Sequence, residues 1–126
     1  MEDLKSITVG QVLERGAAQV PDKTAVVDGN LRKTFDELNR ITDALAAALA
    51  DIGFKKGDRA AIYMQNSFEL IVAFYALQKL GVIAVWVNSL YRRNESEFIL
   101  NNSEAKAVFI FSQQEGHDYL EDILNI

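Results

Sequence analysis

Residues 70–87 form an almost unbroken apolar run, and this run limits the possible folds more than any other feature of the sequence. Its length reaches the minimum of about 17–20 residues for a membrane-spanning helix. However, Gln78, Lys79 and Gly81 interrupt it near the middle, where an ammonium group costs about 2.5–3.5 kcal/mol on insertion scales. The composition also changes at Gly81, from helix formers to β-branched and aromatic residues. The run therefore predicts a buried helix followed by a buried strand, and no membrane span.

The charge balance argues against a nucleic-acid partner. The chain has 18 acidic and 13 basic residues, a formal net charge of −5, and no basic block that would attract a phosphate backbone. It has no cysteine, which excludes disulfides, thiolate metal sites and a cysteine nucleophile. The amino-terminal segment MEDLKSITVG lacks the charged-then-apolar order of a signal peptide. We therefore expect a cytoplasmic protein that does not bind nucleic acid.

Capping residues and apolar spacing predict the secondary structure. Thr8 with Gln11, and Thr34 with Glu37, stand at capping-box spacing and indicate two helix starts. Asp28-Gly29-Asn30 is typical of a hairpin turn. The expected elements, in order, are a helix over 8–20, a hairpin over 24–35, a helix over 34–52 followed by Gly53, a strand over 59–64, a helix over 67–80 capped by Ser67 and closed by Gly81, a strand over 82–87, a short helix begun by Asn94 with Glu97, a strand over 107–111, and a last helix over 117–126.

The order of these elements predicts the fold class. Strands that alternate with helices favour a parallel sheet with right-handed crossovers. The strand over 82–87 has no polar alternation, which is typical of an interior strand covered on both faces. We expect an α/β fold, with a mainly parallel sheet, helices on both of its faces and an amino-terminal β-hairpin. At 126 residues the chain, 1–126, is long enough for a single domain.

Candidate ligand-binding residues follow the predicted strands, because parallel α/β sheets bind ligands at the carboxyl ends of their strands. These ends read Gln65-Asn66-Ser67, then 88–91, then Ser112-Gln113-Gln114, all uncharged and followed by helix starts. They suit a polar ligand or an anion at a helix amino end, although Asn and Ser are also ordinary helix caps. Arg92 and Arg93 follow the second of these ends and can either meet an anion or lie in an exposed loop. The substrate-binding candidates are Asn66, Ser67, Asn88, Tyr91 and Arg92.

No catalytic, cofactor-binding or metal-binding residue is predicted. The seven glycines form neither a GxGxxG nor a GxxxxGK phosphate motif, and no GxSxG segment is present. His117 has Glu121 four residues later, but without a third ligand this pair favours a solvated helix surface over a metal site. The carboxylate pairs at 95/97 and 121/122 also favour solvated helix faces.

An ordered series of motifs resembles the amino-terminal part of the adenylate-forming acyl-CoA synthetases. The resemblance covers nearly the whole chain, and its order is more specific than any single motif. The segment from Asn88 is similar to the fatty-acid type of ligase, chiefly at Asn88, Leu90 and Tyr91. The matching segments are PDKTAVVDG at 21–29, KTFDELN at 33–39, GFKKGDRAA at 53–61, QNSFELIVAFYALQKLGVIAVWVN at 65–88 and NSLYRRNESEFILNNSEAK at 88–106.

Several positions depart from the family pattern. Gln65 and Ser89 stand where the family usually has proline, and Glu104 stands where glycine is common. Trp86 replaces a smaller residue or proline, and it can either wall an acyl channel or fill the core; we expect it to fill the core. These changes affect loop stiffness and packing more than chemistry.

The resemblance implies an amino-terminal portion of a fatty-acid–CoA ligase, which activates a carboxylate with ATP and passes the acyl group to CoA. ATP, Mg and CoA are implied for the complete enzyme only, because the family's phosphate loop, nucleotide-binding segments and catalytic lysine have no counterpart among these residues. We expect the chain to be inactive alone, and to form a homo-oligomer through surfaces that the rest of a ligase would cover. Two alternatives stay open: a stand-alone flavodoxin-like binding module, and a non-catalytic interaction protein on the same scaffold.

Overall fold

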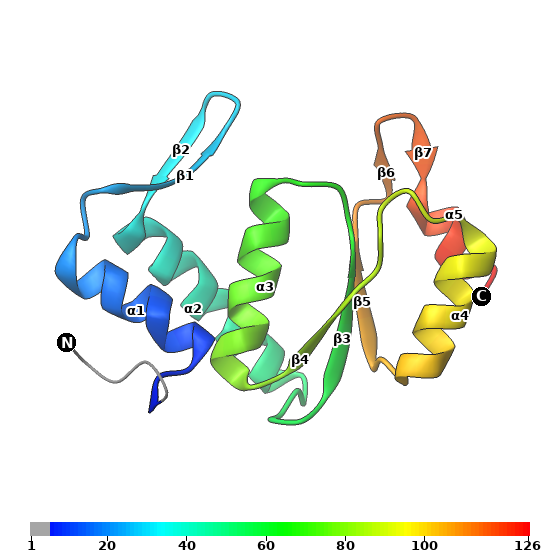
Figure 1. Cartoon of the computed structure of the whole chain (residues 1–126), viewed down its shortest axis with the longest axis horizontal. Helices are drawn as coiled ribbons and strands as arrows, with labels where there is room; N and C mark the ends of the chain where they lie inside the picture. The colour runs from blue at the N-terminus through cyan, green and yellow to red at the C-terminus, as the bar shows by residue number, and fades with distance from the viewer. Residues whose placement is uncertain (1–5) are drawn as a thin grey trace.

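The computed structural model describes residues 6–126, so the part of the signal-peptide argument that rests on residues 1–5 lies outside it. The order of helices and strands follows the sequence prediction, with one additional hairpin near the carboxyl end (Figure 1). The elements are α1 Val9–Gln19, β1 Thr24–Asp28, β2 Leu31–Thr34, α2 Phe35–Asp51, β3 Arg59–Tyr63, α3 Phe68–Leu80, β4 Ile83–Trp86, α4 Arg93–Ser103, β5 Ala107–Ile110, β6 Gln113–Gln114, β7 His117–Asp118 and α5 Tyr119–Leu124.

A three-stranded parallel sheet forms the centre of the fold, as predicted, and its strand order is β4-β3-β5. Helices α2 and α3 lie on one face, and α4 and α5 on the other (Figure 1). Successive residues of β3 point to opposite faces, so Ala60 and Ile62 pack toward α2 and α3, whereas Ala61 and Tyr63 pack toward α4 and α5. Because both faces are covered, β3 has no polar alternation.

Local side-chain caps explain where the first two helices begin. At α1, the Thr8 hydroxyl accepts from the Gln11 N–H at 3.2 Å, and the Gln11 side chain accepts from the Thr8 N–H at 2.9 Å. Thr34 and Glu37 form the same reciprocal pair at α2, at 3.1 Å in both directions. Between the two helices, β1 and β2 pair antiparallel as the predicted hairpin.

The long apolar run divides at Gly81, as the sequence predicts. Gly81 adopts φ 72°, a left-handed conformation that ends α3 and that glycine adopts without a Cβ penalty. Strand β4 then begins at Ile83. No helix within residues 6–126 is both long enough and apolar enough to cross a membrane.

The prediction that β4 is an interior strand and that Trp86 fills the core is wrong. Strand β4 lies at the edge of the sheet, where Ile83 is 50% exposed and Trp86 is 52% exposed. The indole stacks on Phe74, with ring centroids 5.3 Å apart. The apolar sequence of β4 therefore contributes an exposed apolar edge as well as a core.

Two predicted helix boundaries also need correction. Helix α4 begins after Arg92, whose N–H donates to the Glu95 carboxylate at 3.2 Å, and Asn94 lies inside the helix. The predicted helix over 117–126 is shorter, because residues 113–118 form the β6–β7 hairpin. Its turn is Glu115-Gly116, with φ 49° and 80°, and two consecutive positive φ angles are typical of a tight hairpin.

Candidate functional site

The carboxyl ends of the three parallel strands meet through partly buried hydrogen bonds. The Gln65 N–H, after β3, donates to the Gln114 side-chain oxygen at 3.0 Å, after β5. The Tyr119 hydroxyl donates to the Ser89 carbonyl, after β4, at 2.9 Å, and lies 3.2 Å from the Gln65 amide. The three uncharged strand ends named from the sequence therefore form one connected edge of the molecule.

A hollow of about 530 Å³ opens at this edge between β3, β4 and α4. Of the five candidate residues, Asn66, Asn88 and Tyr91 line it, whereas Ser67 and Arg92 do not. Its wall combines amide and hydroxyl groups with apolar side chains, a lining that suits an amphipathic ligand. The lining residues are Met64, Asn66, Leu70, Trp86, Val87, Asn88, Ser89, Tyr91 and Ile99.

Ser67 and Arg92 have structural partners instead. The Ser67 hydroxyl caps α3 by accepting from the Leu70 N–H at 3.2 Å, in line with the capping alternative. The Arg92 guanidinium turns back on its own loop and donates to the Ser89 and Tyr91 carbonyls at 3.1 and 3.0 Å. Arg92 is exposed, but its guanidinium group bonds to carbonyls of its own loop and does not line the hollow.

Carboxylates already occupy the helix amino ends that follow the strands. At α3, Asp28 from the β1–β2 hairpin accepts from the Phe68 N–H at 2.9 Å. Glu95 accepts from the backbone at the start of α4, and Asp118 accepts from the Glu121 N–H at 2.8 Å at the start of α5. This backbone hydrogen bond holds the pKa of Asp118 below its ordinary value. A carboxylate thus accepts from one backbone N–H at each of the three helix starts, which makes these ends less favourable for a ligand phosphate.

Sequence reasoning missed a cluster of Tyr63, His117, Tyr119 and Asp122 beneath the edge. Asp122 Oδ2 lies 3.3 Å from Tyr63 Oη and 2.6 Å from His117 Nε2. Burial raises the pKa of Tyr63, and the Asp122 carboxylate adds to this effect. His117 thus lies in β7 rather than on a solvated helix face, and its partner is Asp122 rather than Glu121. The one sequence feature that could have indicated this cluster was Tyr63, a tyrosine at the end of a buried strand.

The described residues do not fit a magnesium–nucleotide group. Within residues 6–126, no three His, Cys, Asp or Glu side chains come together as a metal site. Because the helix amino ends are also occupied, we assign no step of nucleotide chemistry to these residues.

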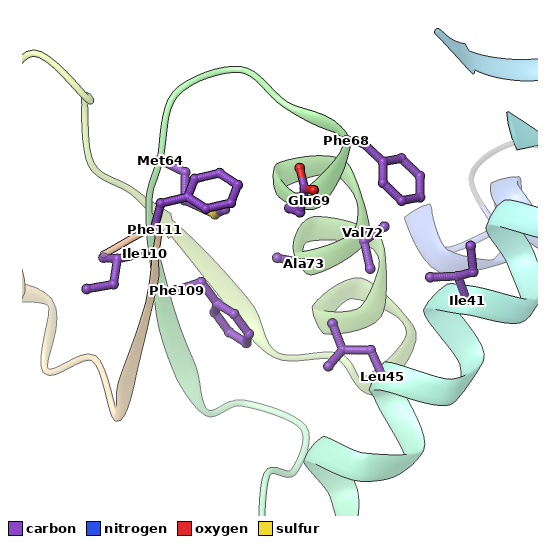
Figure 2. Close-up of a pocket in the computed structure, with 10 residues that line it drawn as sticks. All are labelled: Ile41, Leu45, Met64, Phe68, Glu69, Val72, Ala73, Phe109, Ile110 and Phe111. Carbon is purple, nitrogen blue, oxygen red and sulfur yellow. The ribbon is translucent and has the colours of Figure 1, made fainter. Parts of the chain in front are cut away.

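A second hollow of about 380 Å³ lies between α2, α3 and the outer edge of β5 (Figure 2). Its wall is apolar apart from Glu69. Phe109 and Phe111 enter it from β5 and the residue after it, on the side of Leu45 of α2 and Ala73 of α3 (Figure 2). Because β5 has no further strand beside it among the described residues, this groove is an apolar surface at an open sheet edge.

The fold and its uncharged strand ends define an α/β domain of the kind that binds small molecules at a sheet edge. A family model described as "AMP-binding enzyme" matches residues 13–125. The chain belongs to this family of AMP-binding enzymes. This family assignment replaces the alternative of a flavodoxin-like module.

Relatives with named activities cover almost all of the chain. It is 35% identical to the putative acyl-CoA synthetase YngI of Bacillus subtilis in an alignment of 127 residues. This alignment covers 99% of this chain and 23% of YngI. The chain is also 35% identical over 125 residues to the human medium-chain acyl-CoA ligase ACSF2, covering 95% of this chain and 20% of that protein. The chain thus spans about a fifth of the length of the curated relatives it matches.

Solved structures show the same fold. The N-terminal domain of FACL13 from Mycobacterium tuberculosis matches with a TM-score of 0.79 and 34% identity, over 82% of this chain and 27% of that one. The chain therefore corresponds to an amino-terminal part of the adenylate-forming fold.

Proposed function

We propose that this chain is the amino-terminal portion of an ATP-dependent fatty-acid–CoA ligase. Such an enzyme converts a carboxylate and ATP to an acyl-adenylate, and then transfers the acyl group to CoA. The observation that carries the proposal is the family match over residues 13–125, together with acyl-CoA ligases that align with nearly the whole chain.

The described residues contribute scaffold and one wall of a ligand site in this proposal. The sheet edge with Asn66, Asn88 and Tyr91 faces the ligand, whereas the groups that bind ATP and Mg and that perform the transfer belong to the rest of the ligase. The chain alone is therefore catalytically incomplete, and residues 1–126 act as a single α/β domain. Small molecules are the partners of the complete enzyme only.

A fatty acid is the proposed substrate class, within a role in fatty-acid metabolism. Two features support it: the segment from Asn88 to Tyr91 is of the fatty-acid type, and the relative ACSF2 is named a medium-chain acyl-CoA ligase. The predicted cytoplasmic location remains part of the proposal and rests on composition.

Self-association is the proposed behaviour of the isolated chain. Its two open sheet edges carry apolar surface: Ile83 and Trp86 on β4, and the phenylalanine-lined groove beside β5. Exposed apolar patches of this kind favour association. Light scattering on the purified chain should give a mass above that of a monomer, and a monomer mass at high concentration would contradict this part of the proposal.

A chimera tests the proposed activity. Residues 13–125 replace the matching segment of human ACSF2, and a cooperative melting transition first establishes that the chimera folds. We expect ATP- and CoA-dependent thioester formation from medium-chain fatty acids and much less from acetate or benzoate. The unmodified ligase is the control. A folded chimera that forms no acyl-adenylate from any fatty acid would contradict the proposal.

A further inference from the structure

Two buried tyrosines hold the loop that follows β4. The Tyr119 hydroxyl donates to the Ser89 carbonyl at 2.9 Å, and the Tyr63 hydroxyl donates to the Tyr91 carbonyl. Both tyrosines are 0% exposed, and their rings pack edge to face with centroids 4.8 Å apart. Hydroxyls from β3 and from α5 therefore reach two carbonyls of one loop from the interior of the protein.

Two backbone N–H groups of the loop donate to Asn88 within the loop. The Leu90 N–H donates to the Asn88 side-chain oxygen, and the Tyr91 N–H donates to the Asn88 carbonyl, both at 2.9 Å. The two carbonyls that the tyrosines reach also accept from the Arg92 guanidinium, at 3.1 and 3.0 Å, and Leu90 is 75% exposed. A loop whose donors and acceptors are fixed in this way is ordered before any ligand binds.

We infer that Tyr63 and Tyr119 are positioning residues that fix the loop over 88–92 as one wall of the ligand hollow. Neither tyrosine lines the hollow. Through Tyr119, helix α5 becomes part of the site, although the pair His117 and Glu121 in the expected helix over 117–126 favoured a solvated helix surface. The inference rests on the proposed function only in treating this loop as facing a ligand.

Hydrogen exchange distinguishes a positioning role of the two hydroxyls from a general stabilising role, because the two roles predict faster exchange in different parts of the protein. If the hydroxyls only contribute to global stability, their removal speeds hydrogen exchange throughout the protein. If they position the loop, removal speeds exchange at the Leu90 and Tyr91 amides and leaves a distant helix unchanged. Trp86, the only tryptophan in the chain, lies two residues before the first residue of the loop and is a second local reporter.

The test compares Tyr63→Phe and Tyr119→Phe with the control Tyr75→Phe, which removes a hydroxyl from α3 on the other face of the sheet. Each variant keeps the aromatic ring. The 126-residue chain is followed by amide hydrogen exchange, with α2 as the internal reference, and by Trp86 emission. We expect about 3- to 10-fold faster exchange over 88–92 in the first two variants, as loss of one hydrogen bond predicts, and a changed Trp86 emission. Tyr75→Phe should leave the loop and Trp86 unchanged.

The inference is overturned if exchange over 88–92 changes by less than about 2-fold, or if α2 accelerates by the same factor. If Tyr119→Phe does not fold, Tyr63→Phe alone decides. Because no catalysis is measured, an unchanged loop leaves the proposed ligase function standing. A chimera that forms no adenylate would likewise leave this result intact.

Discussion

Lys79 provides the sharpest prediction about the motif KLG at the end of α3. Its ammonium group lies 2.6 Å from the Asp43 carboxylate and 2.6 Å from the Asn39 side-chain oxygen, both on α2. It also donates to the Asn39 carbonyl at 3.1 Å, and the side chain is only 6% exposed. We predict that Lys79→Met lowers the free energy of unfolding by about 2 kcal/mol, because α3 loses its polar attachment to α2.

The magnitude comes from separate contributions. A hydrogen bond to a charged group contributes about 1.5–3 kcal/mol when buried, and the contact with Asn39 is of this kind. Asp43 is 58% exposed, so that ion pair adds only about 0–1 kcal/mol. The Asn39 carbonyl keeps a second donor, the Thr42 hydroxyl at 3.0 Å, which limits the loss. Methionine retains the apolar packing of the lysine stem.

Urea unfolding followed by circular dichroism measures this effect. With a slope of about 2 kcal/mol per molar urea, the midpoint should fall by about 1 M. The matched control is Lys33→Met, which removes a lysine that lies 3.8 Å from Glu37 and is 31% exposed, and it should shift the midpoint far less. Equal midpoint shifts in the two variants would refute the reasoning and would leave Lys79 available for a role other than packing.

Three further predictions concern single positions. Gly10→Ala should destabilise the fold by about 1–2 kcal/mol in denaturant unfolding, because the new Cβ would lie 3.0 Å from the Lys79 backbone; Gly16→Ala, whose Cβ meets only a side chain, should cost less. Glu104→Gly should raise stability by about 0.5–1 kcal/mol, since Glu104 ends α4 at φ 56°; a lower melting temperature would contradict this. The pKa of Asp58 is lowered, first by the Lys55 N–H and then by Lys106, so its contribution to stability is present above about pH 4 and is lost as pH falls further. Asp58→Asn should therefore make the melting temperature less sensitive to acid, and an unchanged acid profile would count against it.

Local signals made the helices and the parallel sheet predictable. Capping boxes depend on residues three positions apart, and the apolar spacing of α2 depends only on helix geometry, so both can be read from the sequence. The position of Trp86 was not predictable in this way. Exposure of β4 depends on strand order, and an apolar strand reads the same at the centre of a sheet and at its edge.

The candidate site was predictable only in part. The polar strand ends were expected to lie together at one edge, and they do, because parallel strands end together. The roles of Tyr63 and Tyr119 depend on contacts between residues 28 and 30 positions apart, which no local pattern encodes. The β6–β7 hairpin was missed because its turn is Glu115-Gly116 rather than the usual Asn-Gly or Asp-Gly.

The central claim is that these residues supply the scaffold and one wall of a ligase site, while the reacting groups lie in the rest of the enzyme. Carboxylate-dependent exchange of pyrophosphate into ATP by the purified 126-residue chain tests it most directly. The account predicts no exchange above a protein-free blank with any fatty acid. Exchange that requires a fatty acid, scales with the amount of chain and persists through repurification would contradict it.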